Sequence, residues 1–200
     1  MNHRSKFFFF FFIVGLTHVS AQELVSATLL GTKTQAQLLA QFNIPFIQFG
    51  AKYYKITYTT PDVQGLQDTV SGLLVVPDNP NKVYPRLVYQ HGTSGSKQDV
   101  PSVNYENGEG RVGLLFGGLG YVALLPDYLG LGESRGFHPY VHAASEAWVA
   151  EDMLRAASEF AQQNGVQTNE QLFITGYSQG GHAAMALHRD IEKNLSDEFA

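Results

Sequence analysis

The chain of 200 residues contains no cysteine. This absence excludes a disulfide framework, a cysteine-ligated zinc site and a thiol nucleophile. Basic residues are also few: 13 Lys and Arg stand against 18 Asp and Glu, the formal net charge is −5, and no basic cluster marks a nucleic-acid surface. Hydrophobic residues, by contrast, make up 44% of the chain. That share suffices for a buried core and excludes a disordered or fibrous protein.

The N-terminus has the pattern of a signal peptide. Arg4 and Lys6 precede a short apolar stretch, and residues 19–21 (Val-Ser-Ala) supply the small side chains that a signal peptidase requires. The apolar stretch is about half of the roughly 20 residues that a spanning helix needs, and no second stretch follows. We therefore expect a signal peptide over residues 1–21, cleavage after Ala21, and a secreted or periplasmic protein without stable membrane insertion.

The remaining residues, 22–200, contain no repeat, low-complexity tract or linker and are interpreted as one folding unit. Val, Tyr, Thr and Leu are frequent in residues 53–60 and 69–76, which predict an antiparallel strand pair. Short apolar strands and helices then alternate. The expected helices are 34–42, 110–118, 144–163 and one after Ser178, and the expected buried strands are 86–90, 121–125 and 172–175. This alternation is typical of a mostly parallel α/β sheet with helices on both faces.

Residues 176–180 read Gly-Tyr-Ser-Gln-Gly, which is the pattern G-x-S-x-G. The pattern is weak alone, but here it follows a predicted strand and opens a predicted helix, the setting of a nucleophile elbow. Such a turn exposes the hydroxyl of Ser178, while Gly176 and Gly180 keep side chains out of its way. Gly181 is expected to let the helix pack close to the strands. The alternative is an ordinary glycine-rich turn between a strand and a helix.

A nucleophile of this kind needs an oxyanion hole with two N–H donors. Gln179 N–H, at the start of the predicted helix, is one candidate. The loop over residues 91–95 (His-Gly-Thr-Ser-Gly) follows the strand that usually supplies the second donor, and Thr93 N–H is the candidate there. Gly92 allows the backbone to turn into the site. His91 precedes the candidate nucleophile, against the triad order Ser, acid, His of this fold, so we assign it a structural role.

Other polar residues are interpreted as structural. Asp127, at the end of a predicted strand, could be the acid of a triad, but we favour a turn-capping role in which it binds backbone N–H groups. His182 and His188 are expected to face solvent or a neighbouring helix. His138 and His142 lack the partner spacing of metal ligands, and neither a metal nor a cofactor is expected.

Taken together, these motifs resemble the α/β-hydrolase superfamily and, more closely, its secretory lipase family, which includes fungal lipase A. The matching stretches are YTTPD (58–62), VVP (75–77), HGTSG (91–95), PDYLGLG (126–132), HPY (138–140), DMLRA (152–156) and GYSQGGHA (176–183). The resemblance implies an α/β-hydrolase fold with Ser178 as nucleophile and Thr93 and Gln179 at the oxyanion hole. It also implies a small-molecule or lipid ester as the substrate.

The family places its acid and its histidine on loops after later strands. The residues after Ser178 suffice for one helix, and none of residues 179–200 is expected to supply both groups. The strand before the elbow is also expected to be an unpaired apolar edge of the sheet. We therefore expect residues 22–200 to be the N-terminal part of a single α/β-hydrolase domain, inactive alone, with the later strands, lid, acid and histidine missing.

Two classes of function stay open. The first is a secreted serine ester hydrolase, a lipase or carboxylesterase, that acts through an acyl-enzyme on Ser178. A prolyl-oligopeptidase-like serine peptidase would share the same elbow. The second class is an inactive fragment or a non-catalytic binding module on a hydrolase scaffold. We favour the first because the elbow and the oxyanion loop keep the small residues that catalysis requires.

Overall fold

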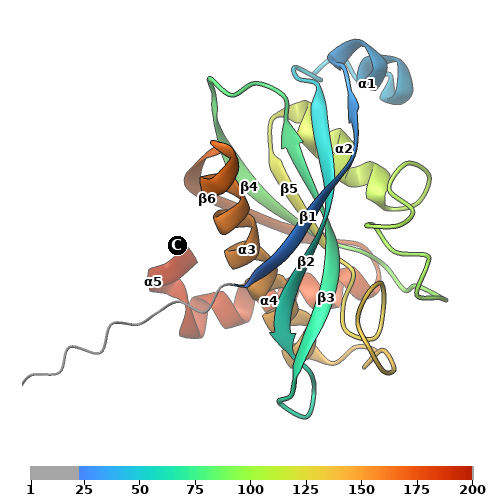
Figure 1. The fold of residues 1–200 in the computed structure, drawn as a ribbon, viewed down its shortest axis with the longest axis vertical. Coiled ribbons are helices and arrows are strands. Elements are labelled where there is room, and N and C mark those ends of the chain that lie inside the picture. Colours follow the sequence, from blue (N-terminus) through green and yellow to red (C-terminus); the bar gives the residue numbers. More distant parts are fainter. Residues whose placement is uncertain (1–22, 200) are drawn as a thin grey trace, which may run out of the picture.

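The computed structural model of the protein describes residues 23–199, so the predicted signal peptide lies outside the described residues. One sheet runs through the molecule, with helices on both sides (Figure 1). Its strands are β1 (Leu24–Lys33), β2 (Ala51–Pro61), β3 (Gln67–Pro77), β4 (Val83–Gln90), β5 (Val122–Pro126) and β6 (Gln167–Gly176). The helices are α1 (Gln35–Phe42), α2 (Gly110–Leu119), α3 (Ala143–Asn164), α4 (Gln179–Asn194) and α5 (Ser196–Phe199). Every strand and helix expected from the sequence is present, and β1 is an additional strand.

The sheet has the order β1-β2-β3-β5-β4-β6. The strands β1, β2, β3 and β5 pair antiparallel in that order, whereas β4 pairs in parallel with both β5 and β6. The predicted parallel arrangement therefore holds for the last three strands, β5, β4 and β6. Because parallel strands end at the same edge of a sheet, the loops that carry the predicted site residues are brought together there.

Strand β6 differs from the expectation of a buried strand. It lies at the edge of the described sheet, and none of its residues is fully buried. Phe173, at its centre, is 45% exposed. The apolar residues 172–174 predicted the strand, but their sequence does not show whether another strand or helix packs beside it. The predicted unpaired apolar edge is thus present among the described strands.

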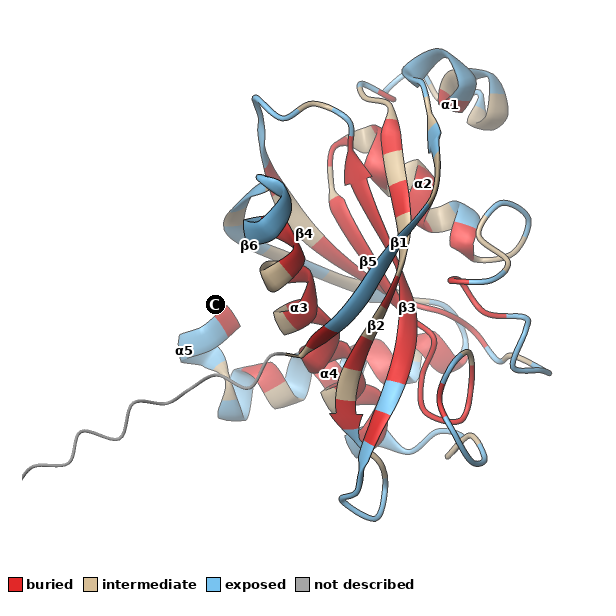
Figure 2. Cartoon of the chain, viewed as in Figure 1, coloured by how far each residue is buried: buried red, intermediate tan, exposed pale blue. Residues whose placement is uncertain are grey.

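Two hydrophobic layers flank the sheet. Buried side chains of α3 and α4, such as Met153 and Leu187, pack with one face, whereas Leu38 of α1 and Leu114 of α2 pack with the other. Figure 2 shows these buried residues as continuous stretches of the central strands and the inner sides of the helices. Helix α3 is amphipathic, with its apolar stripe toward the sheet, as its sequence predicts.

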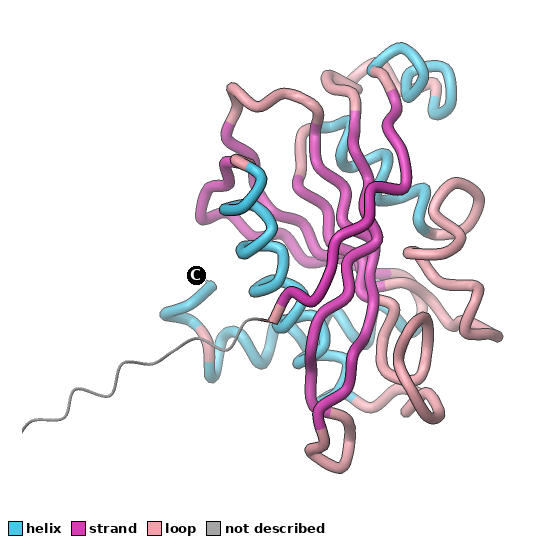
Figure 3. Tube along the Cα trace, viewed as in Figure 1, coloured by secondary structure: helices cyan, strands magenta, loops and turns pink. Residues whose placement is uncertain are grey.

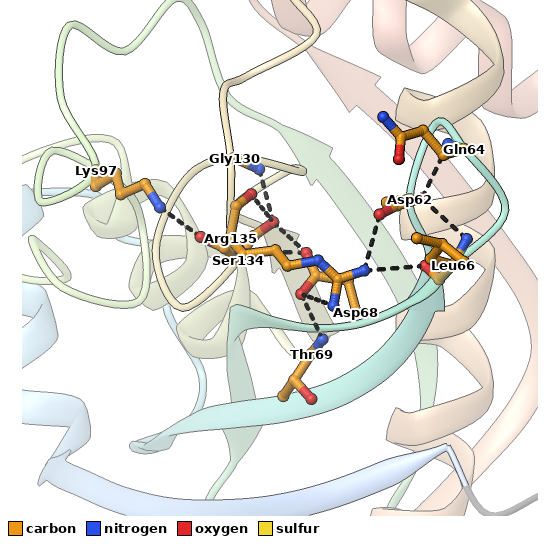
Figure 4. Close-up of polar contacts among 9 residues, drawn as sticks. All are labelled: Asp62, Gln64, Leu66, Asp68, Thr69, Lys97, Gly130, Ser134 and Arg135. Carbon is orange, nitrogen blue, oxygen red and sulfur yellow. Dashed lines mark hydrogen bonds and ion pairs between the residues drawn. The ribbon is translucent and has the colours of Figure 1, made fainter.

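Two long irregular segments follow β4 and β5, and they lie on one side of the molecule (Figure 3). The segment after β5 is tied to the start of β3 and to the turn between β2 and β3. Ser134 Oγ donates a hydrogen bond of 2.7 Å to Asp68, and Arg135 pairs with Asp62 at 2.8 Å, as Figure 4 shows. Lys97 from the segment after β4 donates to the Ser134 carbonyl at 2.5 Å. These contacts hold both irregular segments against the sheet.

Within residues 23–199, no helix combines the length and the apolar character needed to cross a membrane.

Candidate active site

The turn between β6 and α4 holds Ser178 in an uncommon backbone conformation. Its φ is 54° and its ψ is −118°, although it is not a glycine. Such a conformation costs about 1–3 kcal/mol and persists only where the surrounding structure enforces it. Ser178 is exposed, and its hydroxyl has no hydrogen-bond partner among the described residues. The turn therefore presents an exposed hydroxyl on a strained backbone, as the G-x-S-x-G pattern predicts.

Backbone contacts leave room only for glycine at the two motif positions on either side of Ser178. A Cβ atom on Gly176 would collide with the carbonyl of Gly180, and a Cβ atom on Gly180 would collide with the carbonyl of Gln90. A Cβ atom on Gly181, by contrast, would meet no atom within 4 Å. The close approach of α4 to the end of β4 occurs at Gly180. The expectation that Gly181 permits this approach is therefore wrong.

The loop after β4 lies directly against this turn. Tyr177 N–H donates to the Gln90 carbonyl at 3.3 Å, and a Cβ atom on Gly92 would lie 3.3 Å from the Tyr177 ring. Gly92 N–H is already occupied, because it donates to both carboxylate oxygens of Glu109 at 3.1 and 3.0 Å. Glu109 was not singled out from the sequence, where an acidic residue in a loop carries no special signal.

Two other N–H groups at this edge of the sheet are free. Neither Thr93 N–H nor Gln179 N–H has a hydrogen-bond acceptor among residues 23–199. Backbone N–H groups without an acceptor in the protein can donate to solvent or, at a site, to an anionic oxygen. Gln179 also begins α4, where the helix dipole favours negative charge. The two predicted donors are therefore both unoccupied, on loops that contact each other.

His91 is buried within the loop after β4. Its Nδ1 lies 2.6 Å from the Gly92 carbonyl, and its ring stacks on Tyr128 with the centroids 4.2 Å apart. It makes no hydrogen bond to Ser178. Tyr128 itself has a positive φ of 72° and donates from its hydroxyl to the His91 carbonyl at 3.0 Å. His91 thus lies in a position that suits a structural residue of the loop.

Asp127 is buried and binds groups from other segments. Its carboxylate accepts from the Ser71 hydroxyl at 2.6 Å and from the Ser102 hydroxyl and N–H at 2.5 and 3.0 Å. The N–H that it binds belongs to the loop after β4, so the expected cap within its own turn is not formed. Burial raises the pKa of Asp127, while the two serine hydroxyls act against that rise. Within residues 23–199, no histidine side chain forms a hydrogen bond to this carboxylate.

A polar cluster that the sequence did not predict lies behind the elbow. Glu146, in the first turn of α3, accepts from Gln179 Nε2 at 2.8 Å and from His182 Nδ1 at 2.6 Å. Gln179 Nε2 lies 2.8 Å from His138 Nε2 as well. Acidic residues are common in the first turn of any helix, so this one gave no functional signal. His182 faces a neighbouring helix and His188 faces solvent, and both positions agree with the expectation.

A cavity of about 240 Å³ lies beside the oxyanion loop, lined by Gly92, Thr93 and Glu109 among others. Tyr140 and Tyr177 stand exposed near it, and the Tyr140 hydroxyl is 3.2 Å from Thr93 Oγ1. The described part of the chain contains no group of three His, Asp or Glu side chains placed to hold a metal ion. The arrangement can therefore offer a hydroxyl and two backbone donors to a small polar group.

Solved structures are similar to this fold over most of the chain. LipA of Xanthomonas oryzae, an esterase that degrades the rice cell wall, is 32% identical with a TM-score of 0.83, over 90% of this chain and 48% of LipA. A Legionella pneumophila protein assigned as a hydrolase is 31% identical with a TM-score of 0.81, over 89% of this chain and 50% of that protein. The chain has the α/β-hydrolase fold.

A more distant structural neighbour, lipase A of Candida antarctica, is 16% identical with a TM-score of 0.59, over 90% of this chain and 40% of the lipase. That likeness concerns the fold alone. The prolyl oligopeptidase family matches residues 113–193, from within α2 to near the end of α4. No curated protein matches the sequence. The chain spans about half the length of the Xanthomonas and Legionella proteins.

Proposed function

We propose that the chain is the N-terminal part of a secreted serine hydrolase that cleaves carboxylic esters through an acyl-enzyme on Ser178. The observation that carries the proposal is the backbone of Ser178, with its φ of 54° and an exposed, unpartnered hydroxyl beside two free N–H groups. A strained, exposed serine at a strand–helix turn is what nucleophilic attack on a carbonyl requires.

In the proposed reaction, Ser178 Oγ attacks the ester carbonyl and its proton passes to a histidine. The Thr93 and Gln179 N–H groups donate to the oxyanion that forms, a contribution of about 3 kcal/mol each. The tetrahedral intermediate collapses, the C–O bond of the ester breaks, and the histidine returns the proton to the leaving alcohol. Water then cleaves the acyl-enzyme in the same manner. These steps need no metal or cofactor.

The histidine and the acid that orients it are proposed to lie beyond residue 200, together with the lid and the later strands. This proposal is supported by the length of the matched proteins, since the chain corresponds to about half of the Xanthomonas and Legionella proteins. The exposed edge of β6 provides a place for a further strand. The signal peptide over residues 1–21 and export of the protein belong to the same proposal, as does membership of the secretory lipase family.

The preference for an ester rests on the neighbours of this α/β-hydrolase fold. LipA, 32% identical, is an esterase. A second candidate function, a serine peptidase, is favoured by the match of residues 113–193 to the prolyl oligopeptidase family. Both candidates use Ser178 and the same oxyanion site, so they differ in the leaving group, an alcohol or an amine.

The test compares ester and amide substrates on the complete gene product. We expect 4-nitrophenyl esters to be hydrolysed, and we expect Ser178→Ala to lower kcat by a factor of about 10³ or more. Ser158→Ala, which removes a hydroxyl from the middle of α3, serves as the matched control and should leave the rate unchanged. Turnover of prolyl anilides alone would favour the peptidase. Ester turnover that survives Ser178→Ala would overturn both candidates.

A further inference from the structure

We propose that Glu146 is a positioning residue that holds Gln179, and with it the Gln179 N–H, in the oxyanion site. The inference rests on the proposed function, in which this N–H stabilises the oxyanion beside Ser178. Glu146 comes from α3 and touches neither Ser178 nor the oxyanion loop in the hydrogen bonds that the structure shows. It acts through the side chain of the residue that follows the nucleophile.

The contact between Glu146 and Gln179 is enclosed. Glu146 is 1% exposed and Gln179 is 4% exposed. Both carboxylate oxygens are used, one by Gln179 Nε2 at 2.8 Å and the other by His182 Nδ1 at 2.6 Å. Burial of a carboxylate is costly unless hydrogen bonds replace its hydration. A role in packing alone would be filled at lower cost by an apolar side chain.

The hydrogen bonds define the orientation of the Gln179 amide. His138 Nδ1 lies 2.8 Å from the Leu129 carbonyl, which can only accept, so Nδ1 carries the proton and Nε2 is the acceptor. Gln179 Nε2 has two hydrogens, and it faces two acceptors, His138 Nε2 and Glu146 Oε1. Rotation of the amide by half a turn would place its oxygen against the carboxylate. Glu146 is therefore the charged partner that fixes the side chain.

The same carboxylate holds the first turn of α4 at two points. Gln179 and His182 are three residues apart, so they lie on one face of the helix. Because both bind Glu146, the first turn cannot rotate without breaking a buried hydrogen bond. The Gln179 N–H belongs to that turn, and donors of an oxyanion hole are effective only when they are fixed before the reaction. Glu146 supplies this fixation from a helix outside the elbow.

A double-mutant cycle in the complete gene product tests the proposal. Glu146→Ala should lower kcat for ester hydrolysis about 10- to 100-fold with KM within twofold, because the oxyanion forms only in the reaction. Gln179→Ala keeps the backbone N–H but removes the link, so a similar loss is expected. The double variant should lose no more than either single variant. Glu146→Gln, which still offers an oxygen to Gln179, should recover most of the rate.

Controls separate positioning from folding. Glu192→Ala removes the glutamate of an exposed Glu–His pair on α4 and should leave kcat unchanged. A fall in thermal stability of Glu146→Ala with unchanged kcat would overturn the proposal, as would losses in the two single variants that simply add.

A second readout keeps this test independent of the proposed function. If the wild-type protein shows no hydrolysis dependent on Ser178, the proposed function fails, and hydrogen exchange of residues 177–182 then tests the positioning. We expect Glu146→Ala to raise exchange there at least tenfold, with α2 unchanged. Equal exchange in both proteins would overturn the inference.

Discussion

Helix α3 buries two glutamates, Glu146 and Glu151, and the surroundings of the two differ. Glu146 has both oxygens bound by N–H groups of α4. Glu151, 5% exposed, has an oxygen without a partner among the described residues, and its other neighbours include Asp190. Burial, and then the contact with Asp190, raises the pKa of Glu151 to about 8. One helix thus holds a carboxylate satisfied by donors and a second one crowded by a like charge.

We infer from this difference that the two buried carboxyl groups of α3 have separate roles. Glu146 faces the first turn of α4 and sets the geometry behind Ser178. Glu151 faces a later turn of α4 and changes its protonation with pH instead of fixing a donor. We therefore expect substitutions near Glu146 to lower activity and stability, and substitutions of Glu151 to change mainly how stability depends on pH.

The largest expected effect concerns the elbow that Glu146 supports. Gly180→Ala would drive a Cβ atom into the Gln90 carbonyl, so we expect a loss of about 4 kcal/mol or more in the free energy of unfolding. Gly181→Ala, one residue later, meets open space and should stabilise α4 by about 0.5–1 kcal/mol. Urea denaturation of the two variants checks the opposite signs. Equal effects would contradict the described packing of the elbow.

The second largest effect is expected on the removal of Glu146, whose two carboxylate oxygens both accept hydrogen bonds. Glu146→Ala leaves the Gln179 amide and the His182 ring without their acceptor, so we expect a loss of about 2–3 kcal/mol. Urea denaturation near neutral pH measures it. If Glu146→Ala were as stable as the wild type, the carboxylate would not be an essential part of the packing between α3 and α4.

A smaller effect, of opposite sign, is expected at Glu151. Because its pKa is raised from 4.5 to about 8, the folded protein keeps a proton that the unfolded chain releases, and stability falls as pH rises through this window. Burial also raises the pKa of Glu23 to about 7, which adds to the same trend. Glu151→Gln should equal the wild type near pH 4 and exceed it by about 2 kcal/mol at pH 9. Parallel pH profiles of the two proteins would refute this expectation.

The smallest effect is expected on the surface of α4. His188 and Glu192 form an exposed pair at 3.7 Å, four residues apart. Such pairs contribute about 0.3–0.5 kcal/mol at most. Glu192→Ala should therefore shift the thermal midpoint by no more than about 1–2 °C. A larger shift would show that the contrast between buried and exposed glutamate–histidine pairs is overstated.

Much of the fold could be predicted from local patterns. The strand pair β2–β3, the long helix α3 and the alternation of β4, β5 and β6 with helices follow from hydrophobic periodicity. The exposure of Phe173 could not, because burial of a strand depends on what packs beside it. The additional strand β1, largely exposed along its length, lacks the alternation that would mark it.

The sequence predicted the part of the candidate site that lies within one short motif. Ser178, Gly176 and Gly180 lie where G-x-S-x-G implies, because the motif and the backbone strain are local. The carboxylates Glu109 and Glu146 were missed because each binds residues distant in the chain, and acidic residues near helix starts are common. Asp127 was expected to cap its own turn, yet it binds Ser102 from another loop.

A fluorophosphonate probe, applied to the complete gene product and followed by mass-spectrometric mapping of the adduct, tests whether Ser178 is an activated nucleophile. We expect one adduct, on Ser178, that disappears in Ser178→Ala and forms more slowly in Glu146→Ala. Absence of labelling in the folded protein, or an adduct on another serine, would contradict it.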